Sequence, residues 1–81
     1  MTQQEIQSKV NAFMVDRLEY ELNKLMPEAE LKRDLGMTSL DAVELAIFIK
    51  RTFGFQPERN AVKTLLTLQE LCDYIAKNMD K

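Results

Sequence analysis

The fold is decided by residues 34–54, which read DLGMTSLDAVELAIFIKRTFG. This stretch is predicted to form the end of a loop followed by one helix. Thr38, with Asp41 three residues later, resembles a capping box, so we expect the helix to begin at Thr38 or Ser39. Gly54 is placed to end it. The acidic residue near the start and the basic pair near the end both suit the helix dipole.

This central helix is predicted to be apolar on two faces. One stripe consists of Leu45, Phe48, Ile49 and Phe53, and a second, about a third of a turn away, consists of Leu40, Val43 and Ile47. A domain of 81 residues cannot easily bury one helix on all sides. We therefore predict that the first stripe packs in the core and that the second is a contact surface for a partner.

A second helix is predicted before this stretch, over residues 3 to about 25. It ends near residue 25 or several residues earlier, because a proline follows. Its apolar face comprises Ile6, Val10, Phe13, Met14 and Leu18, and Leu22 and Leu25 continue it. The connection over residues 26–38 is charged apart from a few apolar positions, and we expect Leu31 and Leu35 to pin it to the core. Gly36 is predicted to supply a turn that a side chain would obstruct.

Two further helices are predicted after it. A short one runs from Arg59 to about Leu65, and the last one begins at Thr67, where Thr67 and Glu70 match a capping box. Strand patterns are lacking. The predicted fold class is all-α, a small four-helix bundle of three main helices and one short helix, forming a single domain over residues 1–81.

The composition excludes several classes of function. The chain has no histidine and one cysteine, Cys72, so we expect neither a Ser-His-Asp or Cys-His catalytic set nor a metal site. A net charge of -2 gives no general attraction to nucleic acid. The sequence has no apolar run long enough to span a membrane, and its polar start lacks the order of a signal peptide. We expect a cytoplasmic protein in which Cys72 is reduced and packs as a small apolar residue.

Ser39 is the residue in this stretch whose side chain is best placed for covalent modification. The loop delivers its hydroxyl to a helix N-terminus, where an anion such as a phosphodiester on the serine oxygen is favoured. Asp41 and Glu44 would then offer an approaching enzyme an acidic patch beside an apolar strip. Two simpler interpretations stay open on helix rules alone. Thr38 and Ser39 can merely cap the helix, and the two acids can be a solvated surface patch.

Residues 34–41, followed by Val43-Glu44-Leu45, resemble the modification site of acyl carrier proteins. The usual form in that family is Asp-Leu-Gly-x-Asp-Ser-Leu-Asp, followed by an x-x-Glu-Leu helix. The resemblance covers nearly the whole chain. The first helix, Leu31 in the long loop, Phe53 at the end of the second helix and Thr67-Leu68-Gln69 at the start of the last helix all fall in register.

The resemblance implies that Ser39 carries a 4′-phosphopantetheine arm, transferred from coenzyme A by a phosphopantetheinyl transferase. Acyl groups would be held on the arm as thioesters, and the chain would be a carrier rather than an enzyme. The implied partners are ketosynthases, acyltransferases, reductases and dehydratases of fatty-acid, polyketide or related lipid synthesis, and the carrier is expected to be a monomer. The residues expected to contact partners are Thr38, Leu40, Asp41, Val43, Glu44, Ile47, Lys50 and Arg51.

Two features depart from the family pattern. Thr38 replaces the usual Asp, which keeps a hydroxyl cap but removes a charge next to the modification site. Lys50 and Arg51 end a helix that is usually acidic, and residues 50–63 carry four basic residues and one acid. Such a patch would repel partners that recognise an acidic helix, so we hypothesise a dedicated pathway for a polyene, a polyketide or a surface lipid. The simpler interpretation is a solvated helix end.

Two other functions fit parts of the sequence. One is a carrier-like bundle that is never modified and acts as an interaction scaffold, for which the replacement at Thr38 leaves room. The other is a nucleic-acid binder, which is disfavoured because only the end of one helix is basic.

Overall fold

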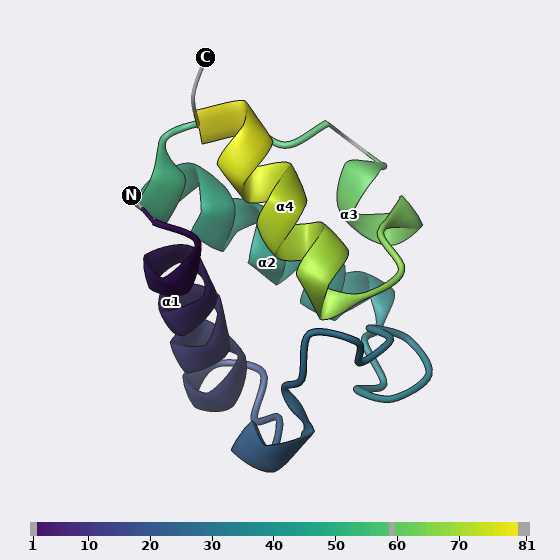
Figure 1. Cartoon of the computed structure of the whole chain (residues 1–81). Helices are drawn as coiled ribbons and strands as arrows, with labels where there is room; N and C mark the ends of the chain where they lie inside the picture. Colours follow the sequence, from purple (N-terminus) through teal and green to yellow (C-terminus); the bar gives the residue numbers. More distant parts are fainter. Residues whose placement is uncertain (1, 59, 80–81) are drawn as a thin grey trace.

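The computed structural model describes residues 2–58 and 60–79, and helices make up most of it (Figure 1). In order, the elements are α1 (Gln3–Asp16), the 3₁₀ helix η1 (Leu22–Lys24), α2 (Ser39–Phe53), α3 (Ala61–Thr64) and α4 (Leu68–Met79). In Figure 1, α4 lies between α1 and α3, in front of α2. It packs against both α1 and α2, and α3 packs against α2. The predicted all-α bundle of three main helices and one short helix is confirmed.

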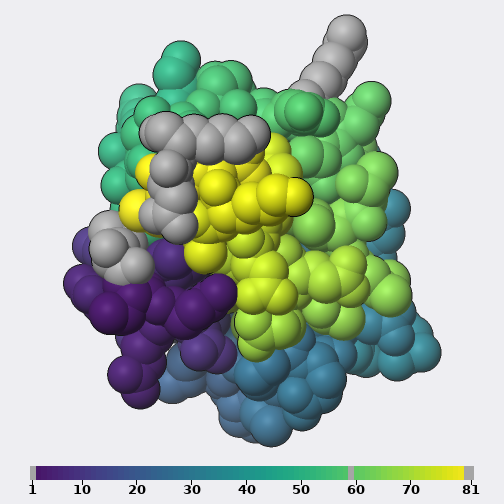
Figure 2. All heavy atoms as spheres, turned by 45° about the horizontal axis from the view of Figure 1, so that its top comes forward, coloured from purple at the N-terminus to yellow at the C-terminus, as the bar shows by residue number. Residues whose placement is uncertain are grey.

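A single apolar core joins these elements. Figure 2 shows α4 closely packed between α1 on one side and the segment around α3 on the other. Cys72 of α4 is buried, and this burial raises the pKa of its thiol to about 11, as expected for a small apolar residue that takes no part in chemistry. The largest fully buried side chains are Ile6, Val10, Met14, Leu31, Leu45, Ile49, Leu68, Leu71 and Ile75.

The helix α1 is shorter than the one predicted over residues 3–25. Glu19 adopts a left-handed conformation with φ 60°, and the N–H of Tyr20 donates to the carbonyl of Met14 at 3.0 Å. This turn redirects the chain soon after the last residue of the helix. The apolar spacing was misleading here because Leu25 is buried without belonging to a helix.

The loop before α2 is fixed to the core, as predicted. Leu31 and Leu35 are both buried. The N–H of Leu31 donates to the carbonyl of Leu66 at 2.9 Å, and the N–H of Leu68 donates to the carbonyl of Ala29 at 3.0 Å. The loop is therefore held by the start of α4, which sets the position from which α2 begins.

Two glycines have left-handed backbones, at the two places where a turn requires one. Gly54 has φ 81° and ends α2, with its N–H donating to the carbonyl of Lys50 at 3.1 Å. Gly36 has φ 70°, but a Cβ built on it would meet nothing within 4 Å. The prediction that a side chain would obstruct this turn was wrong. Glycine is required at residue 36 because of its backbone conformation and not because of crowding.

The C-terminal third differs from the prediction in its details. The helix α3 is a single turn that ends before Leu65, and the predicted start at Arg59 lies outside the described residues. At the start of α4 the hydroxyl of Thr67 accepts the N–H of Glu70 at 3.2 Å. The carboxylate of Glu70 accepts the N–H of Leu66 at 3.5 Å, whereas a full capping box would bond it to the N–H of Thr67. Half of the predicted capping box is thus present.

Candidate functional site

The start of α2 is a capped helical turn. Thr38 is the N-cap residue, and its hydroxyl accepts the N–H of Asp41 at 3.2 Å. In return, the carboxylate of Asp41 accepts the N–H of Thr38 at 3.2 Å. The predicted capping box is confirmed. Because Thr38 supplies the cap, Ser39 is the first residue of the helix, and its exposed side chain is not required for capping.

A tyrosine that sequence reasoning missed also holds Asp41. The phenol of Tyr20 donates a hydrogen bond to Asp41 Oδ2 at 2.9 Å. Burial, together with this hydrogen bond and the nearby negative charge, raises the pKa of Tyr20 well above its usual value. The phenol therefore remains a hydrogen-bond donor at neutral pH. The half-buried carboxylate of Asp41 bonds both to the cap and to the segment after α1, so it fixes the orientation of the α2 N-terminus.

A cavity of about 250 Å³ lies beside Ser39, between α2 and the α3 segment. Its walls are mainly apolar, but Lys32 and Lys63 also line it. Neither lysine forms an ion pair within the part of the chain that the structure describes. Two lysine side chains and the positive end of α2 therefore border the same cavity as Ser39. The sequence analysis counted Lys63 only in the basic patch over residues 50–63 and assigned no role to Lys32, because only the fold brings them to the start of α2.

The apolar stripe predicted to contact partners is exposed in the structure. The exposed fractions are 79% for Leu40, 54% for Val43 and 50% for Ile47. By contrast, Leu45 and Ile49 on the opposite face are both 0% exposed. The division of α2 into a core face and a free face is confirmed.

Charge changes sign along the exposed side of α2. Glu44, like Asp41, lies in the first half, and Lys50 and Arg51 lie in the last turn. Both basic residues are exposed and have no ion-pair partner among residues 2–58 and 60–79. Arg17 at the end of α1 joins Arg51 and Glu44 around a hollow of about 370 Å³ between the two helices. The free face of α2 is thus acidic near its start and basic near its end.

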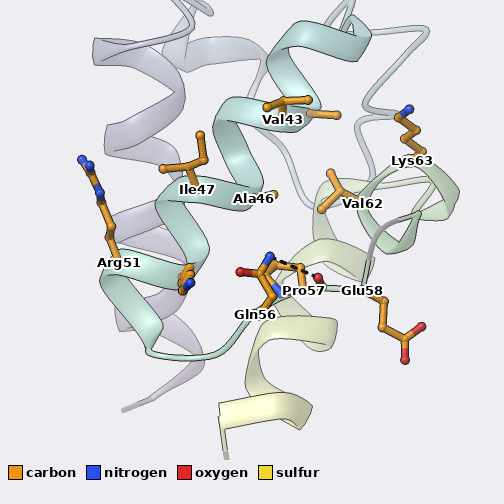
Figure 3. Close-up of a pocket in the computed structure, with 11 residues that line it drawn as sticks. Val43, Ala46, Ile47, Arg51, Gln56, Pro57, Glu58, Val62 and Lys63 are labelled. Carbon is orange, nitrogen blue, oxygen red and sulfur yellow. Dashed lines mark hydrogen bonds between the residues drawn. The ribbon is translucent and has the colours of Figure 1, made fainter.

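A larger groove of about 780 Å³ runs between α2 and the α3 segment (Figure 3). Ala46 and Val62 face each other across it, and Gln56 and Pro57 lie at the end farther from the start of α2. Three residues, Ala42, Val62 and Lys63, line both this groove and the cavity beside Ser39. The two hollows therefore adjoin along α2.

Within residues 2–58 and 60–79, no three carboxylate or thiol side chains gather where they could hold a metal ion. Over the same residues, no helix combines the length and the apolar character needed to cross a bilayer.

Comparison with protein families finds a match to the phosphopantetheine attachment site over residues 8–75. The chain is 37% identical over 75 residues to an acyl carrier protein of Thermosynechococcus vestitus, covering 93% of each chain. The chain belongs to the acyl carrier protein family. This carrier is also 33% identical over 78 residues to an acyl carrier protein of Cyanidioschyzon merolae, covering 96% of the present chain and 86% of the other.

Membership of the family identifies the chain as a carrier that holds 4′-phosphopantetheine covalently, and not as an enzyme. It also implies interaction with a phosphopantetheinyl transferase and with acyl-processing enzymes. The residues at the start of α2 fit this group. They offer an exposed serine hydroxyl, the positive end of a helix, and two lysines that line the neighbouring cavity.

Proposed function

We propose that Ser39 is the residue to which the phosphopantetheine arm is attached. The observation that carries this proposal is the position of Ser39 as the exposed first residue of α2, with the capping role filled by Thr38. Attachment would leave the cap intact, and Lys32 and Lys63 would help to neutralise the new phosphodiester. When attached, the arm supplies a thiol that holds acyl groups as thioesters. The chain itself positions that group and presents it to other enzymes.

The test is the intact mass of the carrier after incubation with coenzyme A and a broad-specificity phosphopantetheinyl transferase. The chain offers a matched control, because its only other serine is Ser8, which is exposed on α1. We expect a mass gain of one phosphopantetheine for the parent and for Ser8→Ala, and no gain for Ser39→Ala. A gain on Ser39→Ala would place the arm elsewhere. If the folded parent gains nothing, the mass of the protein from its native cells distinguishes a selective transferase from an unmodified scaffold.

The same proposal assigns partner recognition to the free face of α2. The apolar stripe offers area for docking, and the charges on either side of it fix the orientation of a partner. A partner that suits this surface has basic residues opposite Glu44 and acidic residues opposite Lys50 and Arg51. The full set of proposed contact residues is Thr38, Leu40, Asp41, Val43, Glu44, Ile47, Lys50 and Arg51.

The basic end of α2 favours a pathway with dedicated enzymes. A general fatty-acid ketosynthase that recognises an acidic helix would be repelled by Lys50 and Arg51. We expect the acyl form of the parent to be elongated more slowly than that of a housekeeping carrier, and Lys50→Glu/Arg51→Glu to recover part of the rate. The control variant Lys77→Glu, which reverses a charge on α4, should recover little of the elongation rate. Equal elongation of the parent and the housekeeping carrier would rule out the dedicated pathway.

The proposal includes three statements about the protein as a whole. It is a single carrier domain over residues 1–81, supported by the one core that joins the described helices. It acts as a monomer, which sedimentation at several concentrations tests directly. It works in the cytoplasm, where the thiols of Cys72 and of the arm stay reduced.

A further inference from the structure

The groove between α2 and the α3 segment has the size and the lining of a ligand site. Its volume of about 780 Å³ falls within the range of roughly 300–1,000 Å³ that is usual for small-molecule pockets. Ala42 and Ala46, one helical turn apart on α2, leave it open because their side chains are small. Val62 and Pro57 line it from the other side, and both are buried. The middle of the groove is therefore apolar.

The two ends of the groove carry positive charge. Lys63 lines the end that adjoins Ser39, and Lys50, in the last turn of α2, lines the groove toward its other end. Neither forms an ion pair with any residue that the structure describes. In Figure 3 the side chains of Glu58 and Arg51 point away from the groove. The charges left to face a ligand are thus the two lysines, one near each end.

Gln56 adds a polar group at the end distant from Ser39. One N–H of its side-chain amide donates to the carbonyl of Pro57 at 3.4 Å (Figure 3). The amide has a second N–H, which is available to a ligand oxygen. An ammonium group and an amide N–H are the donors that a carboxylate requires.

The distance from Ser39 to Lys50 along α2 matches the length of the arm. Lys50 follows Ser39 by eleven residues on α2, which is about 16 Å along the helix axis. The arm has a backbone of about 13 bonds from phosphorus to sulfur, and at the spacing of an extended peptide it spans roughly 14–16 Å. An arm that follows α2 from Ser39 therefore brings the acyl group on its thiol to the end lined by Lys50 and Gln56.

We propose that this groove binds acyl groups that end in a carboxylate, the half-thioesters of dicarboxylic acids, and that Lys50 and Gln56 hold that carboxylate. The occupant then has one negative charge at each end, a phosphodiester beside Lys63 and a carboxylate beside Lys50, with apolar atoms between them. An acyl group with a neutral end gains nothing from Lys50. This inference rests on the proposed attachment of the arm to Ser39.

The test compares two acyl groups of the same shape. Glutaryl and 5-oxohexanoyl groups differ only in a terminal carboxylate against a methyl ketone, and both are loaded from their coenzyme A thioesters by the broad-specificity transferase. Loading is verified by intact mass. The thermal unfolding midpoint is then measured for the parent, for Lys50→Gln and for the control Lys77→Gln. The side-chain amide resonances of Gln56 are recorded by NMR in the same samples.

We expect the glutaryl form of the parent to unfold about 2–4 °C above the 5-oxohexanoyl form, as for one partly exposed ion pair. The difference should disappear in Lys50→Gln and remain in Lys77→Gln, and the Gln56 amide should shift only in the glutaryl form. Equal midpoints for two correctly loaded forms would overturn this inference and leave the role of Ser39 intact. A difference that persists in Lys50→Gln would refute the role of Lys50. Absence of the arm from the folded protein of its native cells would refute both proposals.

Discussion

Ile49 and Ile47 lie two residues apart on α2 but on opposite sides of the division between core and free face. Ile49 is 0% exposed and Ile47 is 50% exposed. Replacing each by alanine makes the same chemical change in two environments within one helix. The pair therefore tests whether Ile47 is kept for binding and Ile49 for folding.

The expected magnitudes follow from burial. Ile→Ala removes three carbons, worth about 2.4 kcal/mol of transfer free energy when they are fully buried. At Ile49 the residual cavity adds to this, for a total of about 3–4 kcal/mol. At Ile47 only about half of this transfer free energy is lost. The better helix propensity of alanine restores a few tenths of a kcal/mol, so the net loss of stability is about 1 kcal/mol or less. A chain of this length has roughly 4–12 kcal/mol of total stability, so Ile49→Ala should be folded but marginal.

The assay is urea unfolding followed by far-ultraviolet circular dichroism, with the free energy of unfolding extrapolated to water. Ile49→Val, which should cost about 0.5–1.5 kcal/mol, keeps the core position measurable if Ile49→Ala unfolds. We also expect Ile47→Ala to reduce turnover of the loaded carrier by its acyl-processing enzymes more than Ile49→Val does. Equal destabilisation by the two alanine variants would refute the assignment of the two faces.

Three further outcomes are expected. Tyr20→Phe removes the hydrogen bond to Asp41 and should cost about 1 kcal/mol in urea unfolding, an effect that Asp41→Ala, which removes the acceptor, should largely abolish in the double variant. Burial raises the pKa of Cys72 to about 11, so its contribution to stability is complete below its ordinary pKa near 9.0 and is lost as the pH rises through 11. Cys72→Ala should therefore lose less stability than the parent between pH 9 and 11, and parallel pH profiles would contradict this. Gly36→Ala should lower the free energy of unfolding by about 1–2 kcal/mol because of its positive φ alone. An unchanged unfolding midpoint would contradict this, whereas a shift smaller than that of Gly54→Ala would not.

The sequence predicted the fold where local signals and burial agree. The start and end of α2 were predicted correctly because Thr38, Asp41 and Gly54 determine them within one turn of the chain. The end of α1 was not, because it depends on a left-handed Glu19, a residue type with no strong preference for that conformation. Leu25 packs in the core although it belongs to an irregular segment, and apolar spacing cannot distinguish that case from a continuing helix.

The residues of the candidate site likewise divide into those that local sequence predicts and those that only the fold brings together. Ser39 was predicted from a short contiguous motif and from the resemblance that this motif carries, and the structure places it at the exposed start of α2. Tyr20, Lys32 and Lys63 were not found, because they reach the start of α2 only through the packing of distant segments. The groove that leads to Lys50 was missed for the same reason, since its two walls are separated by the turn at the end of α2.

The uncharged cap on α2 has a consequence for the lifetime of the carrier in the cell. With Thr38 at this position, a phosphodiester on Ser39 has no carboxylate as its immediate neighbour in the chain, and the carboxylate of Asp41 is engaged by Tyr20. The positive end of a helix stabilises such an anion by about 0.3–1 kcal/mol, and this stabilisation exists only while α2 is folded. Modification and folding are therefore thermodynamically linked. If Ser39 carries the arm, as proposed, the modified carrier is expected to populate its unfolded state about 2–5 times less often, and proteases that degrade unfolded chains should remove the unmodified form first.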